Sequence, residues 1–411
     1  MAPKFNTGTD SLYRWVIVGA SAIVLAVGVG VFSNTVTVFF KPLIAEFGWQ
    51  RGSASLIYFA GVMGLALGGI VMGPIPDRTT ARRVSLFGVV IVGLCLLTVA
   101  HADALWQFCL LFFLGSFLGG AAIFAPLLAN VGNWFKTNFG LALGITTAGQ
   151  ALGQGGVPYI AAILIGAVGW RDTLTIMGVI TLVALIPLVL LIRQPPDHAA
   201  AHAPGKAAAD DDVPIPLSPN VVVIWLSVAV VFCCICMSVP LVHLVPLIQD
   251  RGFSLEEGAR ALFLVLLAAV AGRIAFGKLA DLIGPIRAYW IASCWQTLLV
   301  LVFAQLQTLD AFYLFAPIYG FGFAGVMTGV IVCCRVLIPI SRRAGALGIV
   351  TMFAWFGHGL GGYQGGLFFD FTGTYTLTYA IAALAGVINL IIVGSLYFTI
   401  TRRQTLSTAT I

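Results

Sequence analysis

One arginine lies where a permanent charge is costly. Arg273 stands in the run A-G-R-I-A-F-G, inside a long apolar stretch. A guanidinium has a pKa above ~12, so it stays charged even where water is excluded. Two interpretations are open. The side chain can extend toward an interface near Lys278, or it can bind the carboxylate of a small molecule through two parallel N–H···O bonds.

A histidine is the second candidate for chemistry. His243 lies in V-P-L-V-H-L-V-P, near the end of another apolar run. Imidazole titrates near pH 6.5, so it can carry a proton or hydrogen-bond a carboxylate. Pro240 and Pro246 predict a distorted helix whose freed carbonyls could instead hold His243 as a structural residue.

Four further residues are candidates for lining a cavity. His358 lies among glycines in G-H-G-L-G-G, and Asn34 is an amide inside the first apolar run. Phe124 and Tyr319 lie in two other apolar runs, where aromatic side chains are more often packing residues. None of the fifteen carboxylates lies in the middle of an apolar run. The chain therefore lacks the membrane-embedded Asp or Glu that many proton-driven carriers use.

The composition shows which elements must position these residues. Apolar residues make up 60% of the 411-residue chain and charged residues 9%, with a mean hydropathy of +1.03. Soluble domains carry about 25% charged residues, so a soluble enzyme, a nucleic-acid-binding protein and a disordered protein are excluded. The charges separate twelve apolar runs, each long enough to span a membrane. These predicted spans are 15–40, 53–72, 84–100, 104–132, 140–168, 173–192, 220–248, 259–276, 288–306, 311–334, 344–369 and 375–399.

A polar segment divides the chain nearly in half. Residues 193–219 contain Pro, Ala, His and three consecutive Asp, which is typical of a linker. With the N-terminus placed inside, the predicted inner segments hold fifteen of the 21 Lys and Arg residues, the outer segments hold five, and Arg273 is the remaining one. This asymmetry predicts cytoplasmic termini and a cytoplasmic linker. We therefore predict a six-helix half over 1–192, a linker over 193–219, and a six-helix half with a short cytoplasmic tail over 220–411.

A repeated segment supports this two-half design. G-P-I-P-D-R-T-T-A-R-R begins at Gly73, and G-K-L-A-D-L-I-G-P-I-R begins at Gly277. In each copy an Asp follows the Gly by four residues, and basic residues come after it. A Gly allows close helix packing, and the Asp can pair with basic groups or a helix N-terminus. We predict a conformational latch formed by these residues: Gly73, Asp77, Arg78, Arg82, Gly277, Asp281 and Arg287.

Twelve spans, a central linker and this repeat resemble the major facilitator superfamily over the whole chain. The resemblance implies an all-α membrane protein with twelve transmembrane helices in two six-helix halves. Thr80 stands where the superfamily pattern usually has a Gly.

A narrower resemblance is carried by residues 133–149. The run N-W-F-K-T-N-F-G-L-A-L-G-I-T-T-A-G resembles the fifth-helix motif of the monocarboxylate transporters and their oxalate–formate relatives, although Thr137 and Asn138 replace its basic pair. The first-helix motif is partly present, and T-V-F-F-K at 37–41 also resembles that family. The matching residues are Phe135, Leu141, Ala142, Gly144, Ala148 and Gly149 in the fifth helix, and Asp10, Tyr13 and Trp15 in the first.

This second resemblance implies roles for three positions. Family members carry a substrate-binding Arg four residues before the Gly of the second repeat, and Arg273 and Gly277 have that spacing. The eukaryotic members also have an Asp four residues before this Arg, where this chain has Ala269. Asn34 lies where the animal transporters would have a Lys.

The expected function is secondary transport of small monocarboxylates such as lactate or pyruvate. Proton symport with His243 as the titrating group and organic anion exchange without proton coupling both remain open. A membrane enzyme is disfavoured because no H-E-x-x-H, G-x-S-x-G or phosphate-binding loop is present, and a channel would need polar rings. We expect a monomer in the plasma (bacterial inner) membrane, with no metal and no cofactor. Its partners would be the substrate, protons and lipid, and not nucleic acid.

Overall fold

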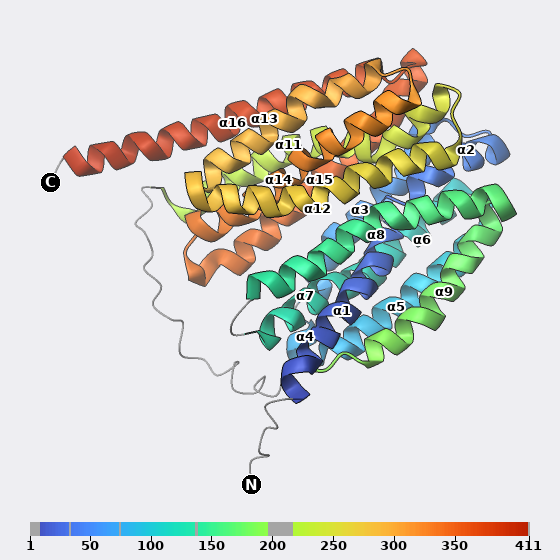
Figure 1. Ribbon diagram of the computed structural model, residues 1–411, viewed down its shortest axis with the longest axis horizontal. Helices are drawn as coiled ribbons and strands as arrows, with labels where there is room; N and C mark the ends of the chain where they lie inside the picture. Colours follow the sequence, from blue (N-terminus) through green and yellow to red (C-terminus); the bar gives the residue numbers. More distant parts are fainter. Residues whose placement is uncertain (1–8, 33, 74, 136–138, 196–216, 410–411) are drawn as a thin grey trace, which may run out of the picture. The chain divides into compact units, whose positions relative to one another are not determined.

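The chain is all helical in the part that the structure describes. The computed structural model describes residues 9–32, 34–73, 75–135, 139–195 and 217–409, so most of the predicted linker lies outside it (Figure 1). These residues contain no β-strand. The helices are α1 (Thr9–Gly30), α2 (Val36–Phe47), α3 (Arg51–Met72), α4 (Ile75–Arg78), α5 (Ala81–Val99), α6 (Leu105–Leu114), a π-helical turn (Gly115–Gly120), α7 (Ala121–Trp134), α8 (Phe139–Val168), α9 (Trp170–Leu190), α11 (Pro219–Asp250), α12 (Leu255–Ile283), α13 (Pro285–Val300), a 3-10 turn (Leu301–Gln305), α14 (Leu309–Leu337), α15 (Ile340–Thr372) and α16 (Thr376–Ala409).

Eleven helical segments of the described residues are long and apolar enough to cross a membrane. They coincide with eleven of the twelve predicted spans. The twelfth predicted span, 344–369, lies in α15, which has 33 residues but a glycine-rich sequence of lower hydropathy. The predicted all-α membrane fold with twelve transmembrane helices is confirmed.

The first predicted span is not one continuous helix. It divides into α1 and α2, and the described residues between them, 31–32 and 34–35, lie in turns. The hydroxyl of Thr35 donates to the carbonyl oxygen of Gly30 at 2.8 Å. A side-chain hydroxyl therefore binds a backbone carbonyl at the break, which suits a membrane interior where backbone polar groups must be satisfied within the protein. No charged residue separates α1 from α2, so the charges that separated the predicted spans did not indicate this break.

The described chain divides into two compact units, each with its own internal packing. Unit 1 comprises the described parts of 1–36 and 63–204, and unit 2 comprises those of 37–62 and 205–411. Residues 37–62, which contain α2 apart from Val36 and the first half of α3, thus belong to the same unit as α11 to α16. The division into halves 1–192 and 220–411 stays a prediction about which segments move together.

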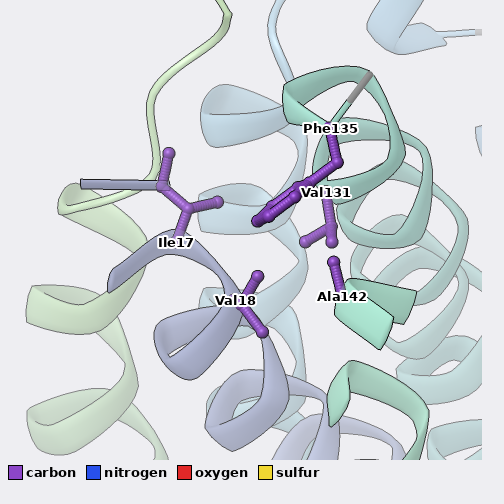
Figure 2. Packing of buried hydrophobic residues seen from close by; sticks show 5 residues of the cluster. All are labelled: Ile17, Val18, Val131, Phe135 and Ala142. Atoms are coloured by element: carbon purple, nitrogen blue, oxygen red, sulfur yellow. The ribbon is translucent and has the colours of Figure 1, made fainter. Parts of the chain in front are cut away.

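Unit 1 packs through small residues and a cluster of apolar side chains. A Cβ at Gly149 would come within 2.7 Å of Ala22, and one at Gly153 would overlap the backbone of Ala26, so α1 and α8 approach closely. Figure 2 shows the cluster at the start of α1, where side chains of α1, α8 and the end of α7 converge. It consists of Ile17, Val18, Val131, Phe135 and Ala142.

This cluster joins the first-helix and fifth-helix motifs found in the sequence. The Trp15 ring lies 5.1 Å from the Phe135 ring, and the Tyr13 ring lies 6.3 Å from the Trp134 ring. The Tyr13 hydroxyl donates to the carbonyl oxygen of Leu191 at 2.6 Å. These motif residues therefore hold α1, α7, α8 and the end of α9 together.

Candidate functional site

Arg273 lies in the interior of α12, at a close helix crossing. A Cβ at Gly272 would overlap the carbonyl oxygen of Phe321, and one at Gly320 would overlap that of Val265, so α12 and α14 are nearly in backbone contact. Arg273 follows directly and is half-buried. The predicted span ended at residue 276, but α12 continues to Ile283. Arg273 is therefore ten residues from the helix end, or about 15 Å at 1.5 Å per residue.

His243 is fully buried between α11 and α15. Its Nε2 atom lies 2.7 Å from the carbonyl oxygen of Gly362. A Cβ at Gly365 would overlap the His243 ring, so glycine at this position makes room for the imidazole. The ring centroids of Phe40 and Tyr375 lie 6.2 and 5.2 Å away. α11 runs unbroken through both of its internal prolines, so the carbonyl that binds His243 comes from α15 and not from a distorted α11.

His358 lies one turn before Gly362 on α15. It is 8% exposed, and its Nδ1 atom lies 3.4 Å from the hydroxyl oxygen of Tyr58 on α3. A Cβ at Gly362 would lie 2.5 Å from the Tyr58 ring. The structure thus brings both predicted histidines to α15 and adds Tyr58, which the sequence analysis did not single out.

The other predicted cavity residues are distributed over both units. In unit 1, Asn34 is buried in the turn after α1 and donates to the carbonyl oxygen of Gln154 at 3.4 Å, and Phe124 is half-buried on α7. In unit 2, Tyr319 is fully buried on α14, with its ring 5.1 Å from Phe303 and 5.7 Å from Phe323. Tyr319 therefore contacts other aromatic rings of unit 2, and its role in lining a cavity stays a prediction.

The first copy of the latch has one feature that explains its unusual sequence. Gly73 follows α3, and the short helix α4 contains Asp77 and Arg78, whose side chains lie outside the described part. Thr80 is the N-cap of α5, and its hydroxyl accepts from the backbone N–H of Arg83 at 3.2 Å. A Gly cannot provide this oxygen. Thr80, which stands in place of the usual Gly of the superfamily pattern, therefore caps α5. Arg82 is exposed.

In the second copy, the Asp and the Arg do not pair with each other. Asp281 is exposed in the last turn of α12. Arg287, at the start of α13, donates through Nε and one terminal nitrogen to the hydroxyl oxygen of Tyr397, at 2.9 and 2.5 Å. Gly277 has a Thr328 methyl as neighbour at 3.8 Å, so an added Cβ would make only ordinary contact there. The predicted pairing of Asp77 and Asp281 stays a prediction.

Unit 2 also contains an ion cluster that sequence reasoning missed. The Arg51 guanidinium binds both oxygens of Asp250, at 2.5 and 2.7 Å, and Lys41 Nζ lies 2.9 Å from one of them. The backbone N–H groups of Arg51 and Gly52 donate to the two oxygens of Asp370, at 2.9 and 2.7 Å. In the sequence, these charged residues lie in predicted loops or at the edges of predicted spans. The partners are 199 and 319 residues apart, so no local pattern indicated their pairing.

The described residues show no metal site. No group of three or more His, Cys, Asp or Glu side chains among them is placed to hold a metal ion. The cysteines are free thiols, mostly buried in the helix packing. The arrangement thus offers a guanidinium inside a span, two buried histidines and a charged cluster at the ends of α3 and α11.

Comparison with solved structures shows the fold of a multi-helix membrane transporter. A bacterial homologue of the human lysosomal transporter Spinster, in an inward-facing and occupied conformation, matches with a TM-score of 0.73 and 16% identity over 95% of this chain and 97% of that one. The nucleoside transporter NupG matches with a TM-score of 0.72 and 13% identity over 93% and 99%.

The sequence comparison shows the family. The profile of the Major Facilitator Superfamily matches residues 22–361, and the chain belongs to this superfamily. The MFS-type transporter YcxA of Bacillus subtilis is 25% identical over 93% of this chain and 96% of its own length. Monocarboxylate transporter 13 of Rattus norvegicus is 25% identical over 91% and 86%, and human monocarboxylate transporter 2 is 23% identical over 92% and 84%. The protein is thus a multi-pass integral membrane protein of a transporter family.

Proposed function

We propose that the protein is a secondary active transporter of small monocarboxylates, lactate- or pyruvate-like, that works by alternating access. The observation that carries this proposal is Arg273, a permanent charge in the interior of a spanning helix, ten residues from its end. A guanidinium presents paired N–H groups that match a carboxylate. The names of two relatives, both monocarboxylate transporters, support the same substrate class.

The second part of the proposal concerns the energy source. Asp and Glu in the described spanning helices lie near helix ends, so a proton coupled to the substrate would be carried by a histidine. We propose symport with a proton, with His243 as the titrating group. The second candidate is exchange of organic anions without protons. The full burial of His243 favours this second candidate, because a charged imidazolium is costly to bury.

The third part concerns orientation in the membrane. We propose a monomer in the plasma (bacterial inner) membrane with both termini cytoplasmic, because fifteen Lys and Arg residues lie in predicted inner segments and five in outer ones. A reporter protein that is active only outside the cytoplasm, fused after residue 411, should be inactive. Full activity of that fusion would invert the proposed topology.

Transport assays in liposomes test the function directly. Purified protein should take up radiolabelled L-lactate, saturate with concentration, and show counterflow when unlabelled lactate is loaded inside. Symport predicts that an inward proton gradient drives accumulation, whereas exchange predicts uptake only with an anion inside. Absence of saturable uptake for lactate, pyruvate, formate and oxalate would overturn the carboxylate proposal. Saturable uptake of an uncharged solute instead would point to another substrate class.

A further inference from the structure

Asp250 holds a position that a free carboxylate could take. Arg51 binds both of its oxygens, and Lys41 adds a third contact at 2.9 Å. Two cations thus share one carboxylate. The Asp side chain ends in a CH₂–COO⁻ group, which is the head group of a small carboxylate anion. The paired geometry is the one by which Arg recognises free carboxylates.

The guanidinium that makes these bonds is held in place independently of Asp250. Its central carbon lies 3.7 Å from the centroid of the Phe369 ring. One of its nitrogens also donates to the hydroxyl oxygen of Tyr375 at 2.9 Å. A phenol ordinarily titrates near pH 10, so this hydroxyl is a neutral acceptor at pH 7. The Arg51 side chain is therefore preorganised, and it would keep its direction if Asp250 left.

A second carboxylate of the cluster has a different task. Asp370, from α15, accepts the first two backbone N–H groups of α3. It thereby stabilises the positive end of that helix. A Cβ at Gly52 would come within 2.8 Å of an Asp370 oxygen, so glycine permits this contact. Since Asp370 is bound to the α3 backbone, Asp250 is the carboxylate that offsets the positive charges of the Lys41 and Arg51 side chains.

These interactions join parts of the chain that the proposed mechanism would separate. Lys41 and Arg51 belong by sequence to the predicted half 1–192, whereas Asp250, Phe369 and Tyr375 belong to the half 220–411. If the two halves rock during alternating access, the Arg51–Asp250 pair must break in each cycle. Breaking such a partly buried pair leaves charges unpaired, which is unfavourable unless another anion takes the vacated position.

We propose that Arg51 and Lys41 form a carboxylate-binding site on the substrate's access route, and that Asp250 fills this site as a tethered carboxylate in this structure. An arriving substrate carboxylate replaces Asp250 on the guanidinium, so the pair opens when substrate is present. The inference rests on the proposed function and on the predicted orientation, which places Lys41, Arg51 and Asp250 on the extracellular side.

The first test is chemical rescue, and it does not depend on transport. Asp250→Gly removes the CH₂–COO⁻ group, and acetate supplies the same group in free form. The purified variant in detergent should melt at a lower temperature than the wild type, and acetate at tens of millimolar should restore part of the loss. Chloride at equal ionic strength should not restore it. The double variant Asp250→Gly/Arg51→Gln should show no acetate response.

A matched control pair lies in unit 1. Arg171 and Asp103 make an ion pair with an N–O distance of 2.9 Å, but Asp103 is 78% exposed. Asp103→Gly should change the melting temperature little and should show no specific acetate effect, because exposed pairs contribute little. Equal effects of acetate and chloride on Asp250→Gly would overturn the proposed carboxylate site.

The second test is uptake of L-lactate from the external medium by cells that express the full chain. Asp250→Asn should lower the half-saturation concentration roughly three- to tenfold, since the tethered competitor is lost, and Arg51→Gln should raise it by a similar factor. If the Arg51–Asp250 pair only stabilises the fold, both changes should shift the half-saturation concentration in the same direction. That result would overturn the proposal. If the wild type takes up no carboxylate while acetate rescues Asp250→Gly, the proposed function fails and the binding site stands.

Discussion

The Nε2 atom of His243 lies 2.7 Å from the carbonyl oxygen of Gly362 and joins α11 to α15 inside unit 2. A carbonyl only accepts, so Nε2 carries the hydrogen. The Nδ1 atom is then the unprotonated nitrogen in a neutral ring. It is buried and has no hydrogen-bond partner among the described residues. A neutral imidazole with its hydrogen on Nε2 satisfies this contact and leaves no N–H group buried without an acceptor.

His243 should be important for stability as well as for any proton step. His243→Ala removes this hydrogen bond and opens a cavity beside Gly365, which should lower the free energy of unfolding by roughly 1–3 kcal/mol. His243→Gln can still donate and should lose less. Thermal unfolding in detergent measures both changes in stability. It is detected as the loss of monodisperse protein on heating. Wild-type stability of the Ala variant would show that the bond contributes little.

The same variants separate the two coupling schemes. If His243 carries the proton, His243→Gln should lose accumulation driven by a pH gradient and keep lactate counterflow, because glutamine does not titrate. If transport is anion exchange, the Gln variant should respond to pH as the wild type does. Uptake in liposomes with and without a pH gradient distinguishes these outcomes.

The glycines at the α12–α14 crossing should resist substitution. A Cβ at Gly272 would overlap the carbonyl oxygen of Phe321, so Gly272→Ala must push two helices apart. Overpacking of this kind costs about 1–3 kcal/mol. Gly348→Ala on α15 is the matched control, because nothing lies within 4 Å of its added Cβ. The first variant should melt well below the wild type and the second at or above it. Equal melting temperatures would contradict the close approach.

The sequence predicted the spans well, because hydropathy follows directly from composition along the chain. It predicted less where the structure depends on contacts between distant residues. The break between α1 and α2, where the Thr35 hydroxyl binds the Gly30 carbonyl, contains no charged residue that would have marked it. The end of α12 was placed too early because Lys278 and Asp281 were taken as loop charges, although the helix continues to Ile283. The Arg51–Asp250 pair joins residues 199 positions apart, which local spacing does not reveal.

The repeated loop motif leads to a prediction about rate. Asp281→Asn and Asp77→Asn should each lower the maximal transport rate more than they change substrate affinity. A latch sets the populations of conformations and does not contact the substrate. Initial rates of lactate uptake over a range of concentrations separate the two parameters. Wild-type rates in both Asp variants would show that the motif is only a solvated loop and not a latch.

Arg273 leads to the sharpest prediction about the substrate. Its position inside α12, directly after the Gly272 crossing, is ten residues from the helix end. If the guanidinium binds the substrate carboxylate, Arg273→Ala should abolish measurable binding while the protein remains inserted and monodisperse. Removing one partner of a desolvated charge pair typically costs about 2–5 kcal/mol, or roughly 30- to several-thousand-fold in affinity.

Arg273→Lys should also bind poorly, because an ammonium cannot make two parallel bonds to one carboxylate. An arginine that only extends to the interface predicts the opposite, since lysine would serve equally well there and alanine would cost little. Dissociation constants for lactate, measured in detergent on the wild type and both variants, decide between these roles. Wild-type affinity in the Lys variant would exclude the carboxylate clamp at this position.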